Sequence, residues 1–356
     1  MMTYKVFKRL TDGELKTIFH LLQEGDDMTA FQNYEWMKTI DLSFRKNRLR
    51  TLFGQIRYLT IFKDSKPVMV FPFHVQRHTL KIGKFGYKRG LYLLGQRSYS
   101  DYLTPIYQSI NIEVLQYAVS VACDYFKLYT IYLGQLREET AIRRLVMSEN
   151  KLFQTTVTGC EHCVALSFPL TFDEFCKGLS KNLISNLKKQ RNRQRRENVH
   201  ITYELIEGVC QNEHIRQRIG EIHSERFNDK NCGNVNMILG KFLNVVYGGI
   251  DEIQHAMSHN PYSWLLLGKN NGEIISYIYG LKDRHAIRVM QLGFSTEYKR
   301  YAPGIITFLE YVKDNYTNLQ GSVIDFTRGE ERYKYELGGK QHIIYDHCIT
   351  YNKKIM

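Results

Sequence analysis

The sequence of 356 residues predicts a mixed α/β fold in which one order of strands and helix occurs twice. Three observations support this prediction. Each half contains an apolar strand–turn–strand segment, then a strand ending in Leu-Gly ten residues before a proline, then an amphipathic helix that leads into a strand ending in glycine. Because six features agree in order, we predict an internal duplication whose two copies join near residues 156–169.

The two predicted hairpins come first in each half. Their strands are rich in β-branched and aromatic residues, and the turn of the second contains Asn-Gly, which is a strong hairpin signal. The strand, turn and strand are expected at 58–63, 64–66 and 67–73 in the first half, and at 264–268, 269–272 and 273–279 in the second.

The next elements continue the parallel between the halves. Gly95 precedes Pro105 by ten positions, and Gly293 precedes Pro303 by ten. We expect each proline to open a helix, since proline lacks the N–H that a first helical residue leaves unused. The predicted strand, helix and strand are 91–95, 112–126 and 128–134 in the first half, and 289–293, 304–316 and 322–329 in the second.

A basic segment lies between the halves. Lys177 to Arg196 contains eight Lys and Arg residues and no acid, so it carries +8 of the net charge of +13. Ser180 can cap a helix, and leucines at 179, 183 and 187 form a narrow apolar stripe, which predicts a basic helix over 180–197. Its polar face is either a solvated surface or a site for phosphates. A second helix is expected over 215–227.

Composition narrows the class of protein. Hydrophobic residues at 43% and charged residues at 24% exclude a disordered chain, and the net charge of +13 favours an anionic partner. There is no targeting segment and no apolar run long enough to span a membrane, so we expect a cytoplasmic protein. The seven cysteines are scattered, which favours free thiols. Cys160 and Cys163 form a lone CxxC without a second ligand pair, so no metal site is predicted.

Several catalytic motifs are absent. The sequence has no GxSxG, no P-loop, no dinucleotide-binding GxGxxG and no HExxH. Ser-His-Asp catalysis, nucleotide hydrolysis and zinc proteolysis are therefore not supported.

The last forty residues carry a specific motif. Residues 325–334 read Asp-Phe-Thr-Arg-Gly-Glu-Glu-Arg-Tyr-Lys, and this stretch closely resembles the GNAT-type N-acyltransferases of the CelD-like (cellulose-biosynthesis-associated) family, which is related to the Fem peptidyltransferases with their tandem GNAT units. Looser matches are Ala302-Pro303-Gly304, His223 with Arg226, the basic helix, Phe31-Gln32 with Trp36, and Leu94-Gly95 with Asp101-Tyr102.

The resemblance implies two tandem GNAT-like units. Residues 1–160 would form a non-catalytic unit on the acceptor side, and 161–356 the catalytic unit. It further implies acetyl-CoA or another acyl-CoA as co-substrate, with the pantetheine arm in a splay between two central strands and the pyrophosphate at the start of the following helix. The donor-binding residues implied are Lys299, Arg300, Pro303, Gly304 and Ile305.

Acyl transfer to an amine requires a proton acceptor, stabilisation of an oxyanion and a proton for the departing thiolate. We expect Glu330 or Glu331 to be the base, Tyr333 to protonate the thiolate, and Lys334 to stabilise the oxyanion or hold an anionic group of the ligand. The alternative for this cluster is a structural ion-pair network. The candidate substrate-binding residues are Asp101, Tyr102, His223, Arg226 and Arg328.

Three functions remain open at this stage. The leading one is an acyl-CoA-dependent N-acyltransferase acting on an amino sugar, a polysaccharide precursor or a small amine. The second is a Fem-like transferase that uses aminoacyl-tRNA, although residues 180–250 lack the long coiled coil common in that group. The third is a non-catalytic binding module in envelope polysaccharide assembly. The sequence predicts no oligomeric state.

Overall fold

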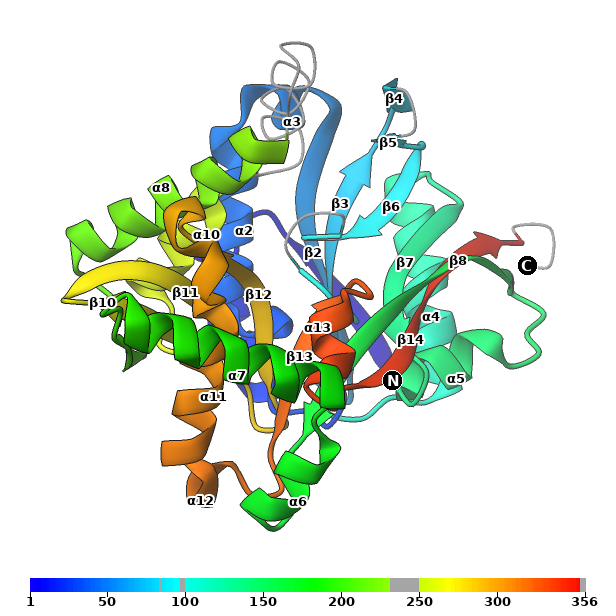
Figure 1. The fold of residues 1–356 in the computed structure, drawn as a ribbon. Coiled ribbons are helices and arrows are strands. Elements are labelled where there is room, and N and C mark those ends of the chain that lie inside the picture. Colours follow the sequence, from blue (N-terminus) through cyan, green and yellow to red (C-terminus); the bar gives the residue numbers. More distant parts are fainter. Residues whose placement is uncertain (83–84, 97–99, 231–249, 353–356) are drawn as a thin grey trace. The chain divides into compact units, whose positions relative to one another are not determined.

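The computed structural model describes residues 1–82, 85–96, 100–230 and 250–352 (Figure 1). They divide into two compact units. The first unit contains residues up to 161 together with 250–252 and 343–352, and the second contains 162–230 and 253–342. Each unit has a mixed sheet with helices packed against it, so the predicted α/β class is confirmed.

The first unit has the strand order β1-β2-β3-β6-β7-β14. All neighbours are antiparallel except β6 and β7, which are parallel. The strands are β1 (Met2–Phe7), β2 (Gly54–Lys63), β3 (Lys66–Gln76), β6 (Gly90–Leu93), β7 (Thr130–Arg137) and β14 (Lys340–Tyr351), with a separate hairpin of β4 (Leu80–Ile82) and β5 (Phe85–Tyr87).

Short helices complete the first unit. They are α1 (Gly13–Leu22), η1 (Ala30–Gln32), α2 (Tyr34–Lys46), α3 (Arg48–Phe53), α4 (Ile112–Phe126) and α5 (Ala141–Met147). Large aromatic side chains such as Phe19, Trp36 and Phe71 are fully buried in this unit. Burying such side chains is the main favourable contribution to its folding.

The second unit has the strand order β9-β10-β11-β12-β13-β8. Only β12 and β13 are parallel. The strands are β8 (Phe153–Ser167), β9 (Ile201–Glu207), β10 (Ser263–Asn270), β11 (Glu273–Lys282), β12 (Ile287–Phe294) and β13 (Val323–Arg328). The series β10-β11-β12-helix-β13 therefore repeats the series β2-β3-β6-helix-β7 in the order that the sequence predicted, and the structure adds that the pairing directions are the same.

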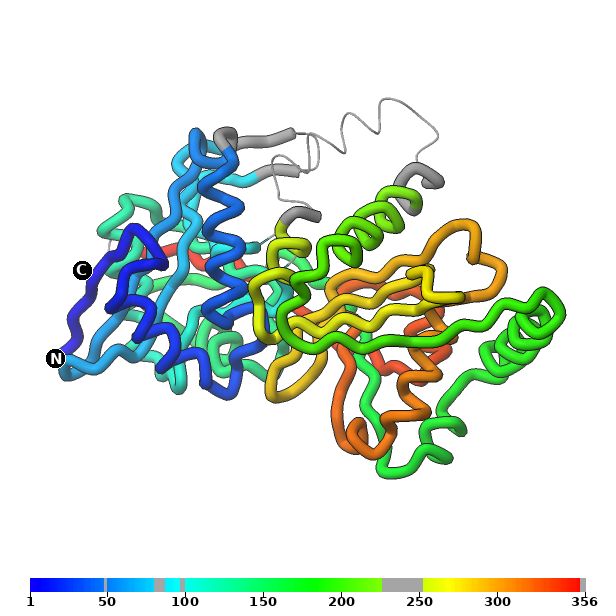
Figure 2. The backbone as a smooth tube through the Cα atoms, turned by 90° about the vertical axis from the view of Figure 1, so that its left-hand side faces the viewer, coloured from blue at the N-terminus to red at the C-terminus, as the bar shows by residue number. Residues whose placement is uncertain are grey.

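The second unit carries helices on both faces of its sheet. They are α6 (Phe172–Gly178), α7 (Lys181–Arg196), α8 (Glu213–Lys230), α10 (Ile250–His259), η2 (Thr296–Tyr301), α11 (Pro303–Asp314), α12 (Tyr316–Leu319) and α13 (Arg332–Glu336). Helices α8 and α11 lie on opposite faces of the strands (Figure 2). The predicted basic helix is α7, and the side chain of Ser180 caps it by accepting from the N–H of Leu183 at 3.1 Å.

Both predicted hairpins close with two-residue turns. Asp64 and Ser65 have φ of 50° and 64°, and Asn271 and Gly272 have φ of 49° and 85°. Positive φ at both central residues is typical of the type I′ turn, whose twist suits a hairpin. The local sequence therefore determined these two turns.

The role predicted for one proline is wrong, although the predicted bounds of the helix that follows it, 112–126, match α4. Pro303 is the first residue of α11, but Pro105 opens no helix, since α4 begins only at Ile112. The reason is that Ile106, the next residue, exchanges two backbone hydrogen bonds of 2.8 Å with Val70 of β3, which keeps the chain extended. The start of α4 is instead set by Asn111, whose side chain accepts from the N–H of Val114.

No helix within the described ranges combines the length and the apolar character that crossing a membrane requires.

Candidate functional site

The parallel strands β12 and β13 part soon after they meet. Their register pairs only Ile287 with Ile324 and Arg288 with Asp325, although β12 continues to Phe294 and β13 to Arg328. Just past the last pair, Thr327 adopts a left-handed φ of 53° and its hydroxyl donates to the carbonyl of Val289 at 2.9 Å. The second unit thus has the strand splay that the resemblance implied.

Buried charges hold the strands at the point where they part. The Asp325 carboxylate, 1% exposed, accepts from the Arg288 guanidinium at 2.6 Å and from the N–H of Thr327 at 2.8 Å. Arg288 also donates to Asp283 at 3.0 Å. A buried carboxylate with these partners fixes the backbone of β13, because leaving either charge unpaired in the core would be costly.

The start of α11 follows the carboxyl end of β12 through η2. Ala302 at its N-cap is left-handed, with φ of 51°, and no side chain caps the helix. A Cβ built on Gly304 would meet no atom within 4 Å. The first turn of α11 therefore has no capping side chain on its N-cap residue and has room beside Gly304, and a helix start of this kind is a suitable place for an anion.

The predicted donor-binding residues all lie at this junction, and two of them, Lys299 and Arg300, are exposed. The charge of Arg300 is partly neutralised, since its guanidinium forms an ion pair with the Glu197 carboxylate at 2.9 Å. The hydrogen bond between Tyr301 and Glu197 raises the pKa of the Tyr301 hydroxyl and lowers the pKa of the Glu197 carboxylate. Helix α7 is anchored here too, because Arg193 donates to the carbonyl of Arg300 at 3.0 Å.

The motif after β13 forms a tight turn around one lysine. The ammonium of Lys334, 2% exposed, donates to the carbonyls of Phe326, Arg328 and Gly329 at 3.1, 2.7 and 3.1 Å. It also pairs with Glu331 at 2.8 Å. Its donors are therefore committed to the chain itself, which favours a positioning role for Lys334 over direct contact with a substrate.

The other predicted catalytic residues are closer to solvent. Tyr333 is half-buried and packs edge-to-face on Phe326, with ring centroids 5.9 Å apart. Glu330 and Glu331 are exposed, and Glu330 accepts from the hydroxyl of Tyr335 at 3.3 Å. Arg328 is half-buried at the end of β13. The structure thus brings these residues together in one turn, and their catalytic roles stay predictions.

A polar cluster that the sequence did not reveal lies on the α8 face of the sheet. The Tyr277 hydroxyl, on β11, donates to the side chain of Gln291, on β12, at 2.9 Å, and lies 3.3 Å from Nδ1 of His223 on α8. Tyr277 and Gln291 are buried. The alternation of side chains along the strands could have predicted that Tyr277 and Gln291 share one face of the sheet. No local signal in the sequence shows that α8 brings His223 to them. The side chain of Arg226 lies outside the described residues.

The two candidates of the first unit are buried. Asp101 is 5% and Tyr102 is 0% exposed, and Tyr102 packs near the ring of Phe31 with centroids 6.3 Å apart. The side chain of Gln32 donates to the carbonyl of Tyr102 at 2.7 Å. Such burial favours a structural role, so substrate contact by these residues stays an untested prediction.

In the first unit the pairing of the two parallel strands, β6 and β7, ends in a similar way, and a side chain lies in the space after it. Its parallel strands pair only at Leu91 with Ile131 and at Tyr92 with Tyr132. The buried side chain of Gln96 lies against β7, since a Cβ on Gly134 would come within 2.6 Å of the Gln96 amide nitrogen. The following helix, α4, is capped by Asn111. The gap and the helix start are therefore both occupied by the chain's own side chains.

Among the described residues, no group of three or more His, Cys, Asp or Glu side chains is arranged to hold a metal ion. Cys160 of the lone CxxC is exposed and Cys163 is buried.

Comparison with solved structures shows the same fold in several proteins. FemX is 9% identical, with 98% of each chain covered and a TM-score of 0.57. A conserved protein of unknown function from Bacteroides thetaiotaomicron VPI-5482 is 12% identical, with 99% of this chain and 100% of that chain covered and a TM-score of 0.51. L-PGS from Bacillus licheniformis is 12% identical, with 96% and 92% covered and a TM-score of 0.51.

Sequence comparison adds one match. No curated protein matches the chain in sequence. Residues 262–335, however, match the family described as an acetyltransferase (GNAT) domain. This stretch runs from β10 to α13 and contains the strand parting, the uncapped helix start and the Lys334 turn. The second unit therefore resembles a GNAT acetyltransferase domain in sequence, and this match indicates an acyltransferase.

Proposed function

We propose that the second unit transfers an acyl group from acyl-CoA to an amine. The observation that carries this proposal is the convergence of three features at one sheet edge. Strands β12 and β13 are parallel and part after two residue pairs, so their carboxyl ends face the same way. The uncapped start of α11 follows the first strand, and the turn with Tyr333 follows the second.

The donor fits this arrangement in two parts. The extended pantetheine arm would lie between β12 and β13, where the backbone pairing of the two strands ends after Arg288 and Asp325. The pyrophosphate would meet the N–H groups of Gly304 and Ile305, with Lys299 close in the chain. The absence of a Cβ at Gly304 allows a phosphate to approach the backbone closely.

The chemistry assigned to the chain's own residues is proton transfer. The amine nitrogen forms a bond to the thioester carbonyl carbon, the carbon–sulfur bond breaks, and the nitrogen loses a proton to a base. We assign the base to Glu330 or Glu331 and the proton given to the departing thiolate to Tyr333. Lys334 holds the turn that presents these groups, through its bonds to three carbonyls.

The acceptor is proposed to be an amino sugar, a polysaccharide precursor or a small amine. The buried polar side chains of Tyr277 and Gln291, with His223 beside them, provide hydrogen-bonding groups on the face of β12 opposite α11. An acceptor on that face would reach the space between β12 and β13 from the side of the sheet opposite α11.

Release of free thiol from acetyl-CoA in the presence of an amine panel tests the proposal. We expect thiol release that depends on both acetyl-CoA and one class of amine. Calorimetry with CoA provides a second measurement, and a folded protein that binds no CoA would contradict the proposed donor.

One observation favours a second donor class, aminoacyl-tRNA. The solvent side of α7 carries six exposed cations, and among the residues that the structure describes only Arg191 of these six pairs with an acid, Glu310. The other five are Lys181, Lys188, Lys189, Arg195 and Arg196. A cationic helix attached beside the start of α11 could neutralise RNA phosphates. Filter binding of tRNA that weakens steeply with salt, and weakens further in a Lys188→Ala/Lys189→Ala variant, would support this donor.

A further inference from the structure

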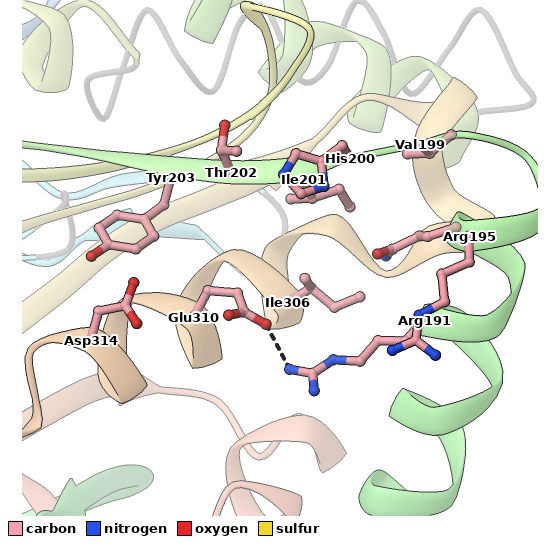
Figure 3. A pocket seen from close by; sticks show the side chains of 11 residues that line it. Arg191, Arg195, Val199, His200, Ile201, Thr202, Tyr203, Ile306, Glu310 and Asp314 are labelled. Atoms are coloured by element: carbon pink, nitrogen blue, oxygen red, sulfur yellow. Dashed lines mark hydrogen bonds and ion pairs between the residues drawn. The ribbon is translucent and has the colours of Figure 1, made fainter.

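A pocket of about 530 Å³ lies between α7, the beginning of β9 and α11 (Figure 3). Its floor is apolar, since Ile201 and Ile306 are 7% and 2% exposed. Strands β10 and β11 separate β9 from β12, so the pocket is distinct from the proposed acyl-transfer site in the same unit. The proposed acyl-CoA site uses none of its lining residues, although Ile306 directly follows Ile305 of that site and Arg195 is one of the α7 cations considered for tRNA.

The charges around the pocket are separated. Arg191 and Glu310 form an ion pair of 2.6 Å, and Arg195 and Asp314 lie on opposite sides of that pair (Figure 3). Within the part of the chain that the structure describes, the side chains of Arg195 and Asp314 make no hydrogen bond or ion pair. The pocket therefore offers one positive and one negative group that do not satisfy each other.

Two further side chains, those of His200 and Tyr203, line the pocket. The ring of His200 lines the pocket, and the backbone N–H of that residue is held by Asn270 at 3.0 Å. Tyr203 lines it with a ring fixed by the edge-to-face contact with Tyr311 and by the hydrogen bond that its hydroxyl accepts from Asn315 at 3.0 Å. In Figure 3 Tyr203 lies on the Asp314 side of the ion pair. A rigid aromatic ring beside a carboxylate is a favourable site for an ammonium group.

We propose that this pocket binds a short zwitterionic peptide, because the two charged groups of a single α-amino acid lie too close together to reach both Arg195 and Asp314 across the ion pair. Its carboxylate would pair with Arg195, its ammonium would lie between Asp314 and Tyr203, and its apolar part would cover Ile201 and Ile306. The four charged side chains sum to zero, so a ligand with only one sign of charge would gain one contact and be repelled at the other end. A molecule with both charges satisfies both ends.

Calorimetry with leucyl-glycine, leucyl-leucine and leucyl-leucyl-leucine, together with backbone NMR of the pocket residues, tests the proposal. We expect at least one of these zwitterions to bind and to shift the amide signals of Thr202 and Asp314. N-acetyl-leucyl-leucine lacks the ammonium and leucyl-leucinamide lacks the carboxylate, so each should bind about three- to fivefold more weakly, which is the range for one exposed ion pair.

Variants assign each charge to its partner. In Arg195→Ala the zwitterionic peptide should lose about three- to fivefold in affinity, and leucyl-leucinamide, which has no carboxylate, should lose nothing. In Asp314→Asn the zwitterionic peptide should lose affinity by the same factor, and N-acetyl-leucyl-leucine, which has no ammonium, should lose nothing. Arg196→Ala is the matched control, because Arg196 is the exposed neighbour that does not line the pocket. Absence of binding across the zwitterions would overturn the proposal, and so would equal binding of inorganic phosphate or an equal loss in Arg196→Ala.

Discussion

Lys334 and Tyr333 are adjacent in the chain but differ in environment. Lys334 is buried and binds three carbonyls of the turn after β13, whereas Tyr333 is half-buried with its ring against Phe326. A buried ammonium with several carbonyl partners stabilises one backbone conformation, since removing it leaves acceptors without donors. The two residues should therefore respond differently to substitution.

Lys334→Met should destabilise the second unit by about 3 kcal/mol, because the carbonyls of Phe326, Arg328 and Gly329 lose their buried donor. Urea unfolding followed by circular dichroism measures this change. Lys313→Met, on the exposed side of α11, is the control and should change stability by less than about 0.5 kcal/mol. A variant with unchanged stability and no activity would instead indicate a direct catalytic role.

Tyr333→Phe should leave the fold intact and lower kcat by about 100-fold, the scale of a lost general acid. The ring contact with Phe326 is retained in this variant, so a change in unfolding is not expected. Tyr262→Phe removes a hydroxyl at an exposed position just before β10 and serves as the control. Equal rates for Tyr333→Phe and the unsubstituted protein would remove Tyr333 from the mechanism.

At the scale of elements, the important difference lies in how two corresponding helices begin. Helix α4 has Asn111 as a side-chain cap, while α11 starts at a left-handed Ala302 with no cap. Uncapped N–H groups in the first turn attract an anion through hydrogen bonding and the helix dipole. This difference supports the proposed anion site at the start of α11 in the second unit.

Gly304→Glu should weaken binding of CoA about tenfold, because a carboxylate in the first turn of α11 would occupy the proposed phosphate site and repel the phosphates. The open space around Gly304 allows the larger side chain without a clash. Calorimetry with CoA measures the effect. Thr317→Glu introduces the same charge at an exposed position of α12 and should bind CoA normally. Equal affinities in both variants would place the donor elsewhere.

At the scale of the whole molecule, the chain has two units with the same strand order and different interiors. Strands β12 and β13 both continue beyond the point where their pairing ends. At the corresponding point in the first unit, the side chain of Gln96 lies against Gly134. Duplicated folds commonly keep their architecture while one copy loses a binding site, since the sheet and its core do not depend on that site.

The protein should therefore bind one donor molecule per chain. Titration calorimetry or native mass spectrometry with CoA gives the stoichiometry directly. A second equivalent of CoA would contradict the assignment of the first unit as non-catalytic. Gln96→Gly, which removes the side chain that fills the first parting, is a variant in which weak additional binding is expected.

Much of the fold could be predicted because its signals are local. The bounds of α4 match the predicted 112–126, and α7 begins after its predicted cap Ser180. Both depend on residues a few positions apart: apolar spacing and a polar side chain that accepts from a nearby N–H. Pro105 shows where local signals fail, since a bridge to distant Val70 decided its conformation.

By itself the sequence determined the α/β class, the repeated order of elements, the hairpin turns and the positions of the motif residues, because periodicity, caps and turn residues act over short distances. Only the tertiary structure decided that Lys334 is buried on three carbonyls, that Tyr277, Gln291 and His223 meet, and that the side chain of Gln96 lies against Gly134. These features depend on contacts between side chains far apart in the chain, and burial and charge pairing become defined only when the strands and helices have packed.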